Sequence, residues 1–250
     1  MSHVQTLTAP GAAARVRSQP GPPLLDAELR QWLEELLRRS AEPDKMTYEQ
    51  FLAWADEDTH AEWVNGEVVM TSPASMRHQE ISLFLATVLG DYVSTRDLGT
   101  AVQPPFQMKL EHGREPDLLF VSKSNRERLR ETYLDGPADL VVEIASPESG
   151  GRDRGEKFYE YARGGVAEYW LIDPDTRWAE FYRLGEEGHY RTAFAAAEGV
   201  YHSAVIPGFW LRVEWLWQQP KPHPLQALGE IAGVDSETVA RFMQALSGTG

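Results

Sequence analysis

The chain has 250 residues and a formal net charge of −14, and 42% of its residues are hydrophobic and 25% charged, as in ordinary globular proteins. It contains no cysteine, which excludes disulfide frameworks, thiolate zinc sites and cysteine nucleophiles, so any metal must bind oxygen or imidazole. The acidic balance argues against a protein that coats nucleic acid through a broad basic face. A local basic cleft, or an acidic site that binds divalent cations, remains compatible with it.

The two ends of the chain differ in composition from its centre. The sequence has no apolar run of about 18 residues and its N-terminus has no secretory signal, so we expect a cytoplasmic protein. Residues 1–23 are rich in Ala, Pro, Gly and Ser and are typical of a flexible leader. Apolar residues then recur at helical spacing from Asp26 to Ser40, which predicts an N-terminal helical extension over residues 24–45. Such a helix must pack on the main domain or on another subunit.

The main domain is expected to begin near Met46. Thr47, followed three residues later by Gln50, resembles a capping box for a short helix that ends at Trp54. The segment EWVNGEVVM, residues 62–70, predicts a β-hairpin, because Asn-Gly is the strongest short hairpin signal. Apolar residues one turn apart over residues 75–93 then predict a long amphipathic helix.

Strands and helices alternate through the remainder of the main domain. Helices are predicted over residues 124–134 and from Asp153 to Gly164. Strands are predicted over residues 100–110, 116–121, 139–145, 168–173, 178–184 and 209–217. The pattern predicts an α/β fold with a mixed central β-sheet flanked by helices. Residues 218–250 are expected to form a Pro-rich linker and a C-terminal helical segment over 225–247.

The segment ADLVVEIAS, residues 138–146, places a glutamate inside a run that is typical of a buried strand. Under the two-residue period of a strand, Glu143 shares its face with apolar neighbours. A buried carboxylate costs several kcal/mol unless it is paired, protonated or bound to a metal. Glu143 therefore needs a partner, which is either an arginine such as Arg152 or Arg154, or a metal ion.

A second carboxylate stands at the start of a strand. Asp117 follows Pro116 and opens the run PDLLFV, and its alternative interpretation is a turn-forming aspartate. Elements close in sequence are usually neighbours in space, so the strands that carry Asp117 and Glu143 are expected to lie side by side. Their carboxylates can then converge on one Mg²⁺ or Mn²⁺, since hard cations prefer oxygen ligands.

Lys157 is the third candidate. Asp153, with Glu156 three residues later, matches a helix cap and a capping box, which places Lys157 in the first turn of the following helix. A lysine beside two carboxylates and a metal can orient or deprotonate an attacking water, or stabilise the charge that grows on a phosphate. This combination suits the hydrolysis of a phosphodiester.

A PD pair, a strand ending in Glu-x-x and a later lysine together resemble the PD-(D/E)XK nuclease superfamily. More narrowly, residues 46–216 resemble the bacterial putative restriction endonuclease family in the segments YEQFLAW, EWVNGEVV, PDLLFV, GPADLVVEIASPES and KFYEYARGGVAEYWLIDP. The resemblance implies a restriction-endonuclease-like core, a divalent metal, and Asp117 and Glu143 as metal ligands. The usual Glu-x-Lys would place lysine at position 145, where this chain has Ala145. The family supplies its lysine from the next helix, which fits Lys157.

Three further residues have two interpretations each. Glu62 matches the family's early glutamate, and is either an additional ligand or supporting group of the site or an exposed hairpin residue. His78 matches a histidine of the family, and either touches substrate or is a polar surface residue. Asp153 is first a helix cap and second a site residue.

The sequence therefore predicts an endonuclease-like domain over residues 46–217 that cleaves DNA with Mg²⁺ or Mn²⁺. In this prediction Asp117 and Glu143 bind the metal and Lys157 positions the water. Two alternatives stay open: a module that keeps the fold and binds nucleic acid or protein without cutting, which Ala145 and the acidic balance favour, and a metal-dependent hydrolase of a small phosphorylated substrate. A homodimer is also expected, because nucleases that cut both strands often pair two active sites.

Overall fold

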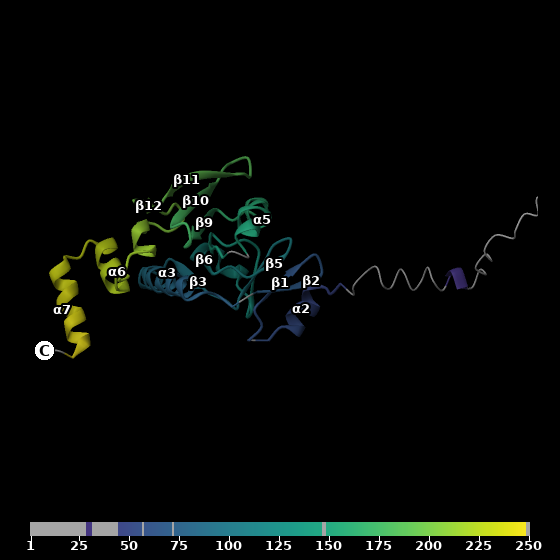
Figure 1. The fold of residues 1–250 in the computed structure, drawn as a ribbon, viewed down its shortest axis with the longest axis horizontal. Coiled ribbons are helices and arrows are strands. Elements are labelled where there is room, and N and C mark those ends of the chain that lie inside the picture. Colours follow the sequence, from purple (N-terminus) through teal and green to yellow (C-terminus); the bar gives the residue numbers. More distant parts are fainter. Residues whose placement is uncertain (1–28, 32–44, 57, 72, 147–148, 249–250) are drawn as a thin grey trace, which may run out of the picture. The chain divides into compact units, whose positions relative to one another are not determined.

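The computed structural model describes residues 29–31, 45–56, 58–71, 73–146 and 149–248 (Figure 1). The chain divides into two units, Met1–Lys45 and Met46–Gly250. The predicted leader over residues 1–23 lies outside the described residues. So does the predicted extension over residues 24–45, apart from residues 29–31, which are helical, and Lys45.

The second unit begins with the two local structures that the sequence predicts most directly. Helix α2 spans Tyr48–Trp54, and the capping box forms: the backbone N–H of Gln50 donates to Thr47 Oγ1 at 3.2 Å, and that of Thr47 donates to Gln50 Oε1 at 2.7 Å. Strands β1 (Ala61–Val64) and β2 (Glu67–Met70) then form the hairpin. Its turn residues, Asn65 and Gly66, have φ values of 53° and 87°, which such a turn requires.

The hairpin belongs to a five-stranded sheet with the order β2-β1-β5-β4-β7. Its other strands are β4 (Gln107–Lys109), β5 (Gly113–Arg114) and β7 (Tyr133–Asp135). Strand β5 pairs with β1 through Trp63 and Gly113. The neighbouring residues Glu62 and Arg114 are thereby placed on adjacent strands.

A six-stranded sheet with the order β11-β10-β9-β8-β6-β3 forms the centre of the unit. Its strands β8 and β9 run parallel and its other neighbouring strands run antiparallel, so the predicted mixed sheet is confirmed. The six strands are β3 (Gly99–Val102), β6 (Leu118–Ser122), β8 (Leu140–Ile144), β9 (Glu168–Asp173), β10 (Trp178–Leu184) and β11 (Tyr190–Ala196). Strands β6 and β8, which carry the two predicted metal-binding segments, are direct neighbours.

Two helices cover opposite faces of the central sheet (Figure 1). Helix α3 (Met76–Thr95) packs on the face that contains Leu140, Val142 and Ile144 of β8. Helix α5 (Glu156–Gly164) packs on the other face. The alternation along β8 therefore directs Glu143 toward α5, as the two-residue period predicts.

The connection into α5 differs from the prediction. Asp153 does not cap α5 but lies inside a separate short helix, α4 (Gly150–Arg154). Gly155, with φ −111° and ψ −95°, breaks the helical path and takes the cap position without a side-chain hydrogen bond. Because α4 is separate, the side chain of Asp153 turns into the protein instead of capping a helix.

Two other predicted elements are wrong. Residues 124–134 do not form a helix, because Lys123–Arg128 form the 3₁₀ helix η1 and the buried Leu134 then pairs in β7 with Met108. The predicted strand over residues 100–110 is interrupted by Pro104 and Pro105, which cannot donate to a ladder, and becomes β3 and β4.

The last part of the unit is helical beyond a small sheet. Strands β12 (Val200–His202) and β13 (Trp210–Arg212) pair, and the chain then forms the 3₁₀ helix η2 (Val213–Leu216), so the predicted strand over residues 209–217 is shorter than expected. The predicted C-terminal helical segment forms two helices, α6 (Pro224–Ala232) and α7 (Ser236–Ser247). Across the described ranges, no helix is long and apolar enough to cross a membrane.

Candidate metal and phosphodiester site

Asp117 lies immediately before β6, one position beyond the ladder pair Leu118–Val142. Continuing the antiparallel register sets Asp117 opposite Glu143 on β8. Its Oδ2 accepts a hydrogen bond of 2.7 Å from the backbone N–H of Ile144, which fixes the carboxylate at this end of the sheet. The sheet thus places the two predicted metal ligands side by side.

Glu143 is buried beneath α5 and its Oε1 accepts two hydrogen bonds from that helix. Tyr161 OH donates at 2.6 Å and Lys157 Nζ at 3.1 Å. Burial raises the pKa of Glu143 to about 8; the Lys157 charge opposes this rise, and neighbouring carboxylates, including Asp153 and Asp117, add to it. The influence of Asp117 on this pKa places both acids in one electrostatic environment.

The raised pKa of Glu143 predicts how stability depends on pH. Between its ordinary value and about 8, the folded state holds a proton that the unfolded state releases, so stability falls as pH rises, by up to about 1.4 kcal/mol per pH unit. The variant Glu143→Gln should lack this contribution and melt at a higher temperature than the parent at pH 8 in EDTA, with a smaller difference at pH 5.

His78 also has a raised pKa, so its contribution to stability likewise falls as pH rises. Both proteins contain His78, so the difference in melting temperature between the parent and Glu143→Gln reports the contribution of Glu143 alone. Thermal melts of metal-free protein from pH 5 to pH 8.5 measure it. A constant difference in melting temperature across this range would contradict the prediction.

Lys157, in the first turn of α5, contacts three buried carboxylates. Its Nζ lies 2.9 Å from Glu62 Oε1, 3.1 Å from Glu143 Oε1 and 3.4 Å from Asp153 Oδ1. Burial alone would lower the pKa of Lys157, but these three carboxylates raise it well above its ordinary value. Lys157 is therefore protonated at neutral pH, so it can orient a water or stabilise negative charge but cannot remove a proton.

Neither Arg152 nor Arg154, the two arginines considered as partners for Glu143, contacts it among the interactions of the described residues. Arg154 instead pairs with Asp173 at 3.0 Å and Glu180 at 3.6 Å. The cation that contacts Glu143 is Lys157, which reaches it from the helix facing β8.

Glu62 is buried, with 2% of its surface exposed, so its interpretation as an exposed hairpin residue is wrong. Its Oε1 contacts Lys157 and its Oε2 contacts Arg114 Nη1 at 3.1 Å. Burial would raise the pKa of Glu62, but Lys157 and Arg114 together hold it below its ordinary value. Glu62 is therefore charged at neutral pH.

Asp153 has no exposed surface, and none of the described residues donates a hydrogen bond to either of its carboxylate oxygens. Its contact with Lys157 at 3.4 Å is an ion pair without hydrogen-bond geometry. Buried carboxylates normally accept hydrogen bonds, because an unsatisfied charged group is costly. Asp153 thus lacks hydrogen-bond donors among the described residues, and a cation bound at its carboxylate would compensate for their absence.

His78, at the start of α3, completes the group. Its Nε2 lies 3.1 Å from Asp117 Oδ1, while its buried Nδ1 has no hydrogen-bond partner among the described residues. Burial would lower the pKa of His78, but the contact with Asp117 raises it above its ordinary value. His78 is mostly buried and holds Asp117, so its interpretation as a polar surface residue is wrong.

The structure brings all six predicted site residues together. We call this group the acid-lysine cluster: Glu62, His78, Asp117, Glu143, Asp153 and Lys157. Its acids come from a hairpin strand, the mouth of β6, the interior of β8 and the short helix α4, while its lysine comes from α5. Three of these segments, β1, β8 and α4, contact the buried ammonium group of Lys157, and His78 of α3 joins the cluster through Asp117.

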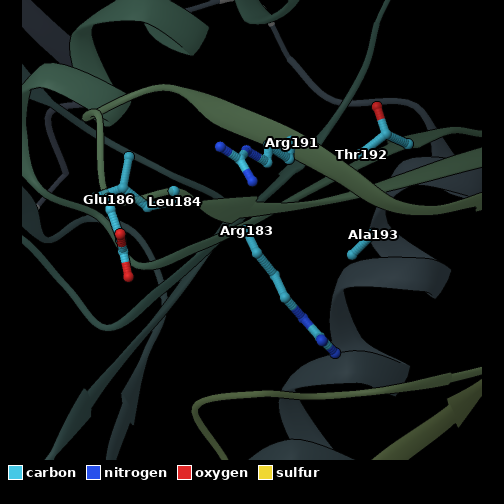
Figure 2. A pocket seen from close by; sticks show the side chains of 7 residues that line it. Arg183, Leu184, Glu186, Arg191, Thr192 and Ala193 are labelled. Atoms are coloured by element: carbon cyan, nitrogen blue, oxygen red, sulfur yellow. The ribbon is translucent and has the colours of Figure 1, made fainter.

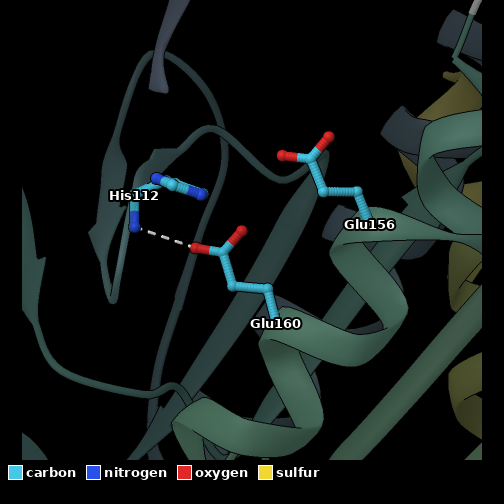
Figure 3. A group of neighbouring side chains, drawn as sticks. All are labelled: His112, Glu156 and Glu160. Atoms are coloured by element: carbon cyan, nitrogen blue, oxygen red, sulfur yellow. Dashed lines mark hydrogen bonds between the residues drawn. The ribbon is translucent and has the colours of Figure 1, made fainter. Parts of the chain in front are cut away.

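A second acidic group lies beside this cluster but does not need a metal. Figure 3 shows Glu156 and Glu160 directed from α5 toward His112, whose backbone N–H donates to Glu160 at 2.9 Å. Arg114 already contacts Glu160 at 2.7 Å and Glu156 at 2.5 Å. A guanidinium group therefore provides the positive charge that a cation would otherwise supply.

Sequence reasoning did not identify Arg114 or assign a polar role to Tyr161. Tyr161 is fully buried, yet its hydroxyl donates to Glu143. Two positions in the sequence could have pointed to this pair of residues. Arg114 stands three residues before Asp117, and its partner Glu160 stands one helical turn after Lys157.

A cavity of about 540 Å³ lies away from the cluster, at the β10–β11 hairpin (Figure 2). It is lined by residues 183–186 and 191–193, none of which belongs to the acid-lysine cluster. Figure 2 shows the side chains of Arg183 and Arg191 pointing in different directions, so the two do not form one anion site.

Comparisons with known proteins agree with this architecture. Residues 48–214 match the family model of Uma2, described as "Putative restriction endonuclease". An uncharacterized protein of Synechocystis sp. is 25% identical over 155 residues, which cover 60% of this chain and 80% of that protein. The crystal structure of a putative nuclease belonging to DUF820 from Anabaena variabilis has a TM-score of 0.58 at 18% identity, over 69% of this chain and 97% of that one. The core is thus the predicted restriction-endonuclease-like α/β fold.

Proposed function

Because the chain belongs to the Uma2 family of putative restriction endonucleases, we propose that it hydrolyses DNA phosphodiester bonds with Mg²⁺ or Mn²⁺ at the acid-lysine cluster. Family and fold support a nuclease-like function. The metal, the DNA substrate and the roles of the six residues form the proposal.

The observation that carries the proposal is the state of Asp153. Asp153 is fully buried, accepts no hydrogen bond at either oxygen from the described residues and shares the Lys157 ammonium group with two other carboxylates, so an additional cation would be favourable there. Asp117, Glu143 and Asp153 would hold the metal, and all three offer oxygen, as Mg²⁺ and Mn²⁺ prefer. When bound, the metal would supply Lewis-acid activation of the phosphate and of a water molecule.

The remaining residues of the cluster act through hydrogen bonds and charge. Lys157, which is protonated, donates toward negative charge that develops on the phosphate, or orients the attacking water. His78 of α3 and Tyr161 of α5, two helices that cover opposite faces of the sheet, hold the carboxylates of Asp117 and Glu143 in place. Positioning by such neighbours commonly changes metal affinity or activity 10- to 100-fold.

Plasmid cleavage tests this proposal. The parent protein should nick or linearise plasmid DNA with Mg²⁺ or Mn²⁺ and not with EDTA, and Asp117→Ala and Glu143→Ala should each lose at least about 100-fold in rate. Asp175→Ala is the matched control, since Asp175 is exposed and pairs with Arg77 outside the cluster. Cleavage that persists in both cluster variants, or that needs no metal, would exclude the assignment.

The net charge of −14 favours one other function, the hydrolysis of a small phosphorylated substrate, because a negative surface repels duplex DNA more than a single phosphate. Parallel assays with DNA and with a panel of nucleotides distinguish the two. The non-catalytic alternative has weaker support, because Ala145 is packed in the core below α5 and Lys157 stands in the cluster in its place.

The homodimer and the cytoplasmic location that the sequence predicts belong to this proposal as well. So do the limits of the endonuclease-like domain, residues 46–217, and the assignment of residues 218–250 as an appended linker and helical segment. Sedimentation of the full chain would decide its oligomeric state.

A further inference from the structure

A buried row of alternating charges joins helix α5 to strands β1 and β5 of the five-stranded sheet. It runs from Lys157 through Glu62 and Arg114 to Glu160, with contacts of 2.9, 3.1 and 2.7 Å. Each of these four side chains exposes 6% or less of its surface. Such a row is a single electrostatic unit, because removing one member leaves its neighbours buried and unpaired.

Glu62 occupies the central place in this row. One carboxylate oxygen, Oε1, contacts Lys157, and the other, Oε2, contacts Arg114. The carboxylate is therefore held from both ends by two cations that come from different elements, α5 and β5. Glu143 and Asp153, the other two carboxylates near Lys157, have no contact with Arg114 among the interactions of the described residues.

Arg114 is itself fixed from the opposite side. Its Nε donates to Glu160 Oε2 at 2.8 Å and its Nη2 lies 2.7 Å from the same oxygen, while Glu156 adds a contact at 2.5 Å. A planar guanidinium can bind carboxylates on several sides at once in a fixed geometry, and a lysine ammonium cannot reproduce this fork. Arg114 is thus anchored before it contacts Glu62.

We infer that Arg114 is a positioning residue, which through Glu62 keeps Lys157 in place when a metal engages Glu143 and Asp153. This inference rests on the proposed function, because it assigns those two carboxylates to a metal. A divalent cation that binds Glu143 and Asp153 competes with the Lys157 ammonium group for these two carboxylates. Glu62 is then the remaining carboxylate contact that holds Lys157 in position. By holding Glu62 on its other oxygen, Arg114 keeps that carboxylate with the lysine.

Three variants of the full chain test the inference: Arg114→Lys, Glu62→Gln and the double variant. Single-turnover cleavage of saturating DNA in Mn²⁺ should fall about 10- to 100-fold in each single variant. The double variant should be no slower than Glu62→Gln, because Arg114 acts through Glu62. Calorimetric titration should give Mn²⁺ affinities within about 3-fold of the parent, since neither residue belongs to the proposed ligands.

A second measurement does not depend on cleavage. Lys157 in the Mn²⁺-loaded protein should react slowly with an acetylating reagent, and about 10-fold faster in Arg114→Lys and in Glu62→Gln, as mass spectrometry of the modified peptide would show. Arg163→Lys is the matched control, because Arg163 forms an exposed ion pair with Glu111 and should leave both measurements unchanged. Thermal melts check that each variant is folded.

The outcomes separate this inference from the proposed function. If the parent binds Mn²⁺ but does not cut DNA, the nuclease proposal fails and the acetylation rates still decide the role of Arg114. If the losses in the double variant multiply, if Mn²⁺ affinity falls in parallel with the rate, or if Lys157 remains unreactive in Arg114→Lys, the inference is overturned. If the parent binds no Mn²⁺, both are overturned.

Discussion

Lys157→Met should lower the free energy of unfolding of the metal-free protein by about 3–5 kcal/mol at neutral pH. Methionine fills a volume similar to that of the lysine, so the loss would come from charge and not from a cavity. Lys157 contacts Glu62, Glu143 and Asp153, and its removal leaves buried carboxylates without their shared cation. Glu62, which Lys157 helps to keep charged at neutral pH, would then bind a proton more readily, so the loss should be smaller at pH 5 than at pH 8.

Urea denaturation in EDTA measures this effect. Lys123→Met is the matched control, because Lys123 forms an exposed ion pair with Asp97 and its loss should cost less than about 1 kcal/mol. Added Mn²⁺ should raise the stability of Lys157→Met more than that of the parent, since the ion replaces the missing positive charge. Equal destabilisation by the two lysine substitutions would show that Lys157 does not hold the acids together.

Asp153→Asn should have two effects of opposite sign. The metal-free protein should become more stable by about 1–2 kcal/mol, because the substitution removes a buried charge whose oxygens accept no hydrogen bond from the described residues. The affinity for Mn²⁺ should fall at least about 10-fold, together with metal-dependent cleavage, since a neutral amide is a weaker ligand than a carboxylate. A gain in stability with a loss of metal binding is the signature of a residue retained for function.

The same substitution at Asp139 is a matched control with the opposite expectation. Asp139 accepts hydrogen bonds from the backbone N–H of Ser122 at 2.7 Å and from Asn125 at 2.8 Å. Asp139→Asn should therefore lose about 1–2 kcal/mol of stability and leave Mn²⁺ affinity unchanged. Melting curves and calorimetric titration of both variants give the comparison. A loss of stability in Asp153→Asn would mean that Asp153 serves the fold.

Local structure was predicted well wherever a few consecutive residues determine it. Thr47 and Gln50 form the predicted capping box, and Asn65 and Gly66 form the predicted turn, because both motifs depend on the backbone preferences of neighbouring residues. The opposite is true of residues 124–134, where the pairing of Leu134 with Met108 outweighs local helical preference.

The site shows the same division. The sequence by itself determined that the strands carrying Asp117 and Glu143 are neighbours and that Glu143 shares a face with apolar side chains, since order along the chain and the two-residue period of a strand indicate both. The resemblance to the family further indicated a lysine from the helix after β8, because Ala145 occupies the usual position, and Lys157 of that helix does lie beside Glu143.

Only the tertiary structure decided which charges share the interior. The partner of Glu143 is Lys157 and not an arginine, Asp153 turns inward from α4, and Arg114 reaches Glu62 from a strand 52 residues away. Such pairings depend on distances between segments that are remote in the chain, and the cost of burying each charge depends on all of its neighbours at once. No local pattern carries that information, which is why the acids could be located along the sequence but their partners could not.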